Sequence, residues 1–161
     1  MSYSLQVNGM GELSGMLSKL GNAAPGVASA SLYEGAGVMA DAVSRAVHGI
    51  ATEPFRYASD GHTRKPSPEE KALLEAAPKG VAKFHKNGIS VDTSVGLSKA
   101  GYGQLGNVTK PIPLIANAIN SGTSFMQKQP FFRKAVSQNR KAAEAAIEAG
   151  ILKRVEQIAN E

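Results

Sequence analysis

The pattern that comes nearest to a known chemical motif is Gly101-Tyr-Gly-Gln-Leu-Gly106, which matches G-x-G-x-x-G. In dinucleotide-binding proteins this motif follows a strand and opens a helix, and an acidic residue about 20 positions later binds the ribose. Here the next helical pattern begins too late, and no Asp or Glu occurs between Asp92 and Glu144. The glycines therefore predict a flexible loop over residues 98–110, and no cofactor is expected.

The other residue types that catalyse reactions or bind metals are scattered along the chain. His48, His62 and His85 are too far apart in sequence to form a local metal-ligand pair. The chain has no cysteine, which excludes disulfides, thiol catalysis and cysteine zinc sites. No serine lies in a G-x-S-x-G motif. The sequence therefore predicts no catalytic, cofactor-binding or metal-binding residue, and a protein that is not an enzyme.

Basic residues are concentrated around the last predicted helix, at Lys128, Arg133, Lys134, Arg140 and Lys141. Four of them form two pairs spaced seven apart, and residues at that spacing share a helix face. Two interpretations stay open. The residues could form a solvated face that Glu144 and Glu148 balance, or they could contact DNA phosphates or an acidic partner ring. The pattern lacks the aromatic interleaving that supports base stacking, so sequence-specific DNA binding is not expected.

The composition is that of a modest domain. The chain has 161 residues, of which 42% are hydrophobic, and we expect a single domain over residues 1–161. Charged residues make up 19%, below the roughly 25% that is usual in soluble domains. The formal net charge is +5. We find no signal-peptide pattern and no apolar run long enough for a membrane span, so we expect a protein of the cytoplasm, or of a particle assembled there.

Two helices are expected in the first 50 residues. A short one lies in an N-terminal extension over residues 1–24, and Gly21, Asn22 and Pro25 should interrupt it. A longer helix should follow, to about residue 50. Its apolar residues form a narrow seam suited to packing on a helix or a sheet: Leu32, Ala36, Met39, Val43, Ala46 and Ile50.

The middle of the chain predicts a loop, a short helix and a hairpin. Residues 51–66 lack any apolar period and should form the loop. The sequence Ser67-Pro68-Glu69-Glu70 then has the form of a capping box and predicts a helix that ends near Pro78.

The hairpin is predicted from Asn87-Gly88, which suits a two-residue type I′ turn. The strands should be Val81–His85 and Ile89–Leu97. This turn would place Phe84 opposite Val91, so that apolar residues pair.

Two helices are expected in the C-terminal third. The first begins near Pro111 or Pro113, and Gly122 is placed to end it. The second begins near Pro130, with a kink at Gly150. Together these elements predict an α+β fold in which a long N-terminal helix and a C-terminal helix flank a small antiparallel sheet.

The segment from Leu114 to Val136 contains a Gly122-Thr123 step, then Pro130-Phe131-Phe132 at the start of a basic, apolar helix. This arrangement resembles the tail-completion family of long-tailed double-stranded DNA bacteriophages, which is comparable to the lambda Z-type tail-completion protein. The resemblance extends over most of residues 28–150. Many relatives carry an acidic residue just before the Gly-Thr step, where this chain has Asn120-Ser121.

The resemblance implies a fold like that of tail terminators and a structural role in the virion. The chain would complete the tail or join head and tail, as a ring, expected to be sixfold, at the head-proximal end of the tail. It would be assembled in the host bacterial cytoplasm. Its partners would be copies of itself and tail-terminator, head-closure or tail-tube proteins, with non-specific contact to packaged DNA. The motif and interface residues would be Gly122, Thr123, Pro130, Phe131 and Phe132.

Within that motif, one phenylalanine is expected to enter the subunit core while the other faces a neighbouring subunit. Two other functions stay open. One is a head-closure or minor capsid subunit elsewhere in the virion. The other is a packaging accessory protein that binds DNA without sequence specificity.

Overall fold

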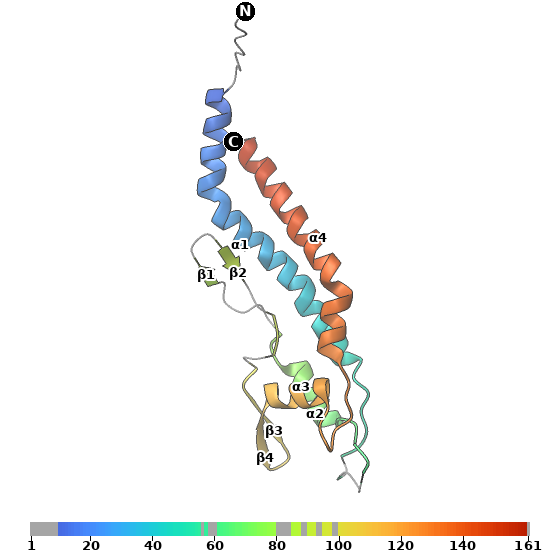
Figure 1. Cartoon of the computed structure of the whole chain (residues 1–161). Coiled ribbons are helices and arrows are strands. Elements are labelled where there is room, and N and C mark those ends of the chain that lie inside the picture. Colours follow the sequence, from blue (N-terminus) through green and yellow to red (C-terminus); the bar gives the residue numbers. More distant parts are fainter. Residues whose placement is uncertain are drawn as a thin grey trace, which may run out of the picture.

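Two long helices form the axis of the molecule (Figure 1). The computed structural model describes residues 10–55, 57, 61–79, 85–87, 90–92, 95–97 and 100–160. The helix α1 covers Met10–His48 and α4 covers Phe131–Ala159. They run antiparallel, with the end of α4 beside the N-terminal half of α1. At a rise of about 1.5 Å per residue, α1 is about 58 Å long and extends past α4.

Small residues bring the two helices close together. A Cβ added to Gly35 of α1 would collide with the Ile147 side chain of α4, and one added to Gly150 of α4 would meet Glu34 and Ser31 of α1. The helix α4 continues through Gly150 without a break. That glycine therefore permits close packing rather than the expected kink.

A smaller layer of short elements covers one end of the helix pair, which we call the base (Figure 1). It contains α2 (Pro68–Ala76) and α3 (Ile112–Ser121). The main hydrophobic core lies here, where α2 and α3 meet the last turns of α1 and the first turns of α4. Its fully buried or nearly buried members include Val43, Val47, Leu74, Ile115, Ile119, Met126 and Phe131.

Two antiparallel hairpins complete the α+β fold. The first joins β1 (His85–Asn87) to β2 (Ser90–Asp92) beside α1. Its predicted register is wrong, because Val91 pairs with Lys86 and Asn87 pairs with Ser90. Glycine suits the second position of a type I′ turn and the first position of a type II′ turn, so Gly88 in the sequence was compatible with either register.

The predicted strand Ile89–Leu97 is also too long. The described part of the strand is Ser90–Asp92, and the chain bends at Gly96 and Leu97. The Leu97 side chain is buried in the core of the base. The predicted partner residues 81–84 lie outside the described residues.

The second hairpin lies where the sequence predicted an irregular loop. The expectation of such a loop over residues 98–110 is wrong, because β3 (Tyr102–Leu105) pairs with β4 (Val108–Pro111). Gly106 has a φ of 58° in the turn, which glycine adopts without strain. A Cβ on Gly103 would lie 2.7 Å from carbons of Leu73 in α2. The glycines of the G-x-G-x-x-G pattern therefore serve a turn and a close contact between elements.

The predicted break between two N-terminal helices is wrong as well, because α1 is continuous through Gly21, Asn22 and Pro25. Alanines on both sides of Pro25 favour the helix. The Ser29 hydroxyl donates a hydrogen bond of 2.7 Å to the Pro25 carbonyl oxygen. Around this segment, added Cβ atoms at Gly15, Gly21 and Gly26 would meet nothing within 4 Å.

The remaining element predictions are confirmed. Ser67 caps α2 in a capping box with Glu70, and the helix ends two residues before Pro78. Gly122 ends α3, and α4 begins directly after Pro130. The residues of the predicted α1 seam are all buried or half-buried.

Candidate functional site

The motif that suggested a function forms the connector between α3 and α4, residues 122–130. Gly122 closes α3 with a φ of 77°, and its N–H donates to the Ala118 carbonyl oxygen at 2.9 Å. A Cβ at Gly122 would lie 2.9 Å from the Cβ of Lys128. Both the backbone angle and this close approach therefore require glycine at the position.

Thr123 folds the connector into a tight turn. Its hydroxyl oxygen accepts hydrogen bonds from the N–H groups of Met126 at 3.0 Å and Phe125 at 3.4 Å. Its own N–H donates to the Met126 carbonyl oxygen at 3.0 Å. These bonds turn the Met126 side chain into the core and leave Phe125 half exposed. The Gly-Thr step is thus explained by local geometry.

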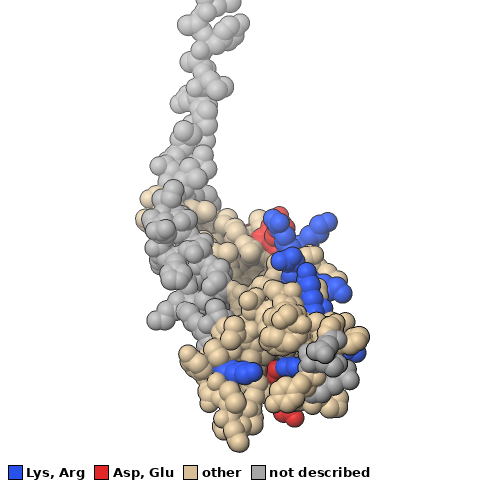
Figure 2. Space-filling model, turned by 60° about the horizontal axis from the view of Figure 1, so that its bottom comes forward, with Lys and Arg blue, Asp and Glu red and all other residues tan. Residues whose placement is uncertain are grey.

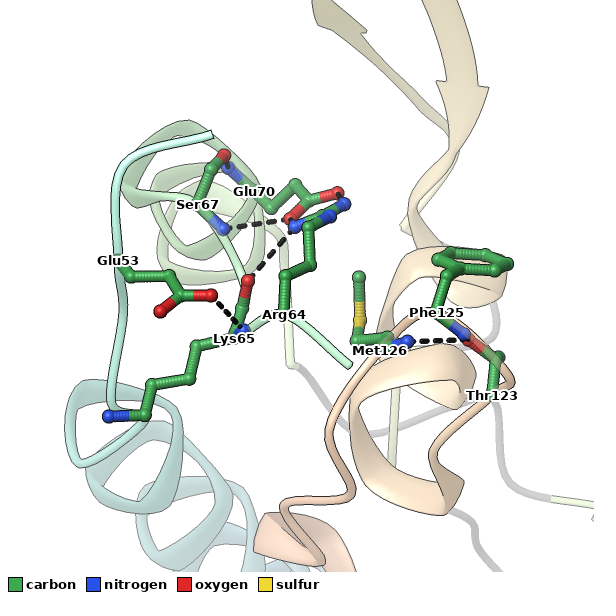
Figure 3. Close-up of polar contacts among 8 residues, drawn as sticks. All are labelled: Glu53, Arg64, Lys65, Ser67, Glu70, Thr123, Phe125 and Met126. Carbon is green, nitrogen blue, oxygen red and sulfur yellow. Dashed lines mark hydrogen bonds and ion pairs between the residues drawn. The ribbon is translucent and has the colours of Figure 1, made fainter. Parts of the chain in front are cut away.

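Arg64, in the loop before α2, holds the connector from the other side (Figure 3). Its N–H donates to the Phe125 carbonyl oxygen at 3.0 Å, and its own carbonyl oxygen accepts from the Gln127 N–H at 2.7 Å. Its guanidinium group donates to both carboxylate oxygens of Glu70, each at 2.7 Å. The two residues are only 6% and 4% exposed. A buried, two-bonded ion pair therefore joins the capping box of α2 to the connector.

The electrostatics of this pair follow from its contacts. Burial acts to raise the pKa of Glu70, but hydrogen bonds from the Arg64 guanidinium and the Ser67 N–H outweigh it, so the pKa is lowered. The same contact with Glu70 raises the pKa of Arg64. Both groups are therefore held in their charged forms, which suits a structural link.

Pro130, Phe131 and Phe132 start α4. Phe131 is buried in the core, and Phe132 is half-buried and packs against that core. The prediction that one phenylalanine enters the core is confirmed for Phe131, while a contact of Phe132 with a neighbouring subunit stays a prediction. The Phe132 N–H donates to the Asn120 side-chain oxygen at 3.2 Å. A side chain from the end of α3 thus caps α4.

The predicted basic residues do not form one cluster. Arg140 pairs with Glu144 at 2.7 Å, so part of this charge is balanced within the helix. Arg133 and Lys141 are exposed. Lys128 and Lys134 instead line a cavity of about 520 Å³ where the end of α1 meets the start of α4, and Arg45 of α1 joins them there. Figure 2 shows most of the visible basic side chains in one band along one side of the molecule.

Gln129, which also lines this cavity, joins the connector to the segment that follows α1. Its side-chain oxygen accepts from the Ala51 N–H at 2.9 Å, and its side-chain nitrogen donates to the Ala51 carbonyl oxygen at 2.8 Å. The connector is therefore attached to the segment that follows α1 as well as to the loop before α2. The connector, the segment after α1 and the loop before α2 are distant in sequence. Their hydrogen bonds together fix the position of Lys128 relative to α1.

Arg64, Asn120 and Arg45 were not predicted as important from the sequence. Arg64 lies in a segment without periodicity, and Arg45 lies on a helix face predicted only from its apolar seam. Asn120 alone had a signal, because Asn120-Ser121 comes just before the Gly-Thr step, where many members of the phage family that the sequence resembles carry an acidic residue. An oxygen acceptor at that position is what the Phe132 N–H requires.

Large apolar side chains are exposed at both ends of the molecule. At the base, Phe55 and Tyr57 make an edge-to-face contact with ring centroids 5.5 Å apart. Phe55 and Val108 line a cavity of about 420 Å³. These three residues, all more than half exposed, are called the base patch below. Along α4, Val136 is exposed near the start of the helix, and the neighbouring residues Ile151 and Leu152 are exposed near its end. We call Ile151 and Leu152 the α4 patch.

The histidines do not come together where their side chains are described. The His48 ring nitrogen Nδ1 lies 2.9 Å from a carboxylate oxygen of Glu75, at the surface. His62 is exposed, and the side chain of His85 is outside the described part. No group of three metal-ligating side chains occurs among the described residues. In the same residues, no helix has the length and apolar character for a membrane span.

Comparisons with protein-family models, curated proteins and solved structures find no match to this chain.

Proposed function

We propose that this protein is a structural subunit of a bacteriophage virion, which completes the tail or joins it to the head as a ring. The proposal begins from the resemblance in the connector and the start of α4. Gly122, Thr123 and Pro130, which carry the resemblance, also shape the connector between α3 and α4.

The observation that best supports assembly is the presence of two separate exposed apolar patches. Tyr57 in the base patch is 88% exposed, and Leu152 in the α4 patch is 56% exposed. Leu152 lies 21 residues beyond the start of α4, about 30 Å along the helix. Large contiguous apolar patches on the surface of a protein often mark a site of protein–protein contact, whereas single exposed apolar side chains are common. Two different patches on one subunit are what a closed ring requires, because each subunit then contacts two neighbours through unlike surfaces.

The test is the oligomeric state of the purified protein, measured by light scattering and by electron microscopy of negatively stained particles. We expect wild-type rings. We expect Tyr57→Ser and Leu152→Gln to remain folded and to fail to close, because both side chains are largely exposed in the subunit. Tyr102→Ser, at another exposed tyrosine outside both patches, is the matched control and should still form rings.

Mixing the two defective variants tests the ring geometry. If the base patch of one subunit meets the α4 patch of the next, a mixture offers only one intact interface and gives short open assemblies, never rings. Full recovery of rings on mixing would contradict the head-to-tail arrangement. A monomeric wild-type protein at all concentrations would contradict the ring itself.

The position in the virion needs a separate measurement. Gold-labelled antibodies against the protein should mark the junction of head and tail in particles from an infected culture. Label on the capsid shell would instead support a minor capsid subunit, and label absent from virions would remove the structural role.

A further inference from the structure

The cavity between the end of α1 and the start of α4 concentrates positive charge. Its lining includes three cationic side chains from three separate segments: Arg45 of α1, Lys128 of the connector and Lys134 of α4. No Asp or Glu contributes to the lining. Within the part of the chain that the structure describes, none of the three cations forms an ion pair.

Three arginines elsewhere are paired with carboxylates, whereas exposed cations such as Lys19, Arg133 and Lys153 also form no ion pair within the described part of the chain. Arg64 is paired with Glu70, Arg140 with Glu144, and Arg154 with Glu34 at 2.8 Å. What distinguishes this cavity is that three cationic side chains share one lining to which no carboxylate contributes. Their mutual repulsion is relieved by an anion, and the low dielectric of the protein wall strengthens that attraction.

We propose that this cavity is a binding site for the phosphates of a nucleic-acid backbone. Three cations match several negative charges better than one carboxylate, and duplex DNA presents one charge for about every 1.7 Å of its axis. Lysine and arginine are the residues that contact phosphate oxygens most often. The side chain of Gln138 also lines the site and offers a further hydrogen-bond donor to such an anion, while the Asn139 side-chain nitrogen already donates to the Ala135 carbonyl oxygen at 2.9 Å.

The same lining argues against recognition of bases. The single aromatic residue in it is Phe131, whose side chain is 7% exposed and committed to the core. Base stacking needs an accessible aromatic face. Binding should therefore depend on charge and salt, and be independent of sequence. The site is complete in one subunit, so the inference does not rest on ring formation or on a position in the virion.

The test is binding of the full-length protein to a short, fluorescently labelled duplex DNA, followed by anisotropy over a series of salt concentrations. The pocket variant combines Arg45→Gln, Lys128→Gln and Lys134→Gln. The control variant combines Lys19→Gln, Arg133→Gln and Lys153→Gln, which are exposed residues outside the cavity lining. Both variants lose three positive charges, and circular dichroism checks that both remain folded.

We expect the pocket variant to bind DNA about tenfold or more weakly at physiological salt, with a much smaller loss of affinity for the control. The slope of log affinity against log salt should fall by about 2.7 in the pocket variant, at about 0.9 for each phosphate that the protein no longer neutralises. Equal losses of affinity in the two variants would overturn the site, because binding would then follow net charge alone. So would an absence of DNA binding by the wild-type protein.

A competition experiment distinguishes nucleic acid from an acidic protein as the partner of this site. Polyglutamate, matched to the DNA in total charge, is used as a competitor against the labelled duplex. The proposal expects polyglutamate to compete more weakly than unlabelled DNA of another sequence. Stronger competition by polyglutamate would overturn the nucleic-acid assignment in favour of a carboxylate-rich protein surface.

Discussion

At the scale of single residues, the ion pair between Arg64 and Glu70 makes the firmest prediction. Arg64→Met removes the guanidinium and leaves a buried carboxylate without a counter-charge. We expect the free energy of unfolding in urea at neutral pH to fall by about 3–5 kcal/mol. The control is Lys65→Met at the neighbouring, half-buried residue. Lys65 contacts Glu53 through its backbone N–H, which this substitution keeps. The free energy of unfolding should therefore fall much less.

The pH dependence of stability follows from the same pair. Because the folded protein lowers the pKa of Glu70, the unfolded state binds its proton first as the pH falls. The stabilisation is therefore complete above the unfolded value of about 4.3 and is lost as the pH drops through the lower folded pKa. Glu70→Gln should weaken the fold at neutral pH and flatten the acid part of the stability curve. An unchanged acid part would show that Glu70 is not held charged.

Asn120 makes a second prediction at this scale. Asn120→Asp keeps an oxygen acceptor for the Phe132 N–H and adds a negative charge at the start of α4, where the helix dipole favours it by about 0.3–1 kcal/mol. Asn120→Ala should destabilise by about 1 kcal/mol.

The control is Asn117→Asp in the last turns of α3, the helix that also contains Asn120. The Asn117 side chain bonds to Ser121 and not to α4. Both aspartates meet the unfavourable end of the α3 dipole, so their difference in melting temperature isolates the cap. Equal melting temperatures would contradict a capping role for residue 120.

At the scale of elements, two neighbouring glycines of α1 should respond in opposite directions. At Gly35 an added Cβ collides with α4, so Gly35→Ala should destabilise by about 1–3 kcal/mol through overpacking. At Gly37 an added Cβ meets nothing within 4 Å. Gly37→Ala should therefore stabilise the helix by about 0.5–1 kcal/mol. Two changes of the same sign in thermal unfolding would show that α1 and α4 do not pack in this register.

The sequence predicts elements well where local chemistry determines them. The start of α2 was predictable because Ser67, Pro68 and Glu70 satisfy the free N–H groups within one turn. The end of α3 was predictable from Gly122, because glycine adopts a positive φ without strain. The start of α4 was predictable from Pro130, because proline fixes its own φ. These signals act within a few residues and need no tertiary partner.

Elements that depend on distant contacts were harder to predict. The β3–β4 hairpin was missed because its glycines suggested a loop, whereas Gly103 is required by the approach of Leu73 in α2. Pro25 suggested a helix break that the alanine-rich surroundings override. The cationic cavity was only half predicted, because Arg45 is 83 residues before Lys128 in sequence and no local pattern joins them.

At the scale of the whole molecule, the first turns of α1 extend beyond α4. Around Gly15, Gly21 and Gly26 there is space for a Cβ, and the described side chains from Ser18 to Gly26 are exposed or half-buried. A chain that starts at residue 25 should therefore keep the melting temperature of the full chain within a few degrees. A large loss of stability in differential scanning calorimetry would show that this segment packs on the rest of the subunit.

The antiparallel pairing of α1 with α4 also governs the order of events on the ribosome. Glu34 and Arg154, which bond across the pair, are 120 residues apart. At a synthesis rate of about 5–20 residues per second, α1 waits about 6–24 s after its own synthesis before its partner exists. Its apolar seam is exposed throughout that interval, and the contact closes a very long loop, which slows folding. Nascent chains of this protein should therefore be clients of holding chaperones until the last helix has emerged.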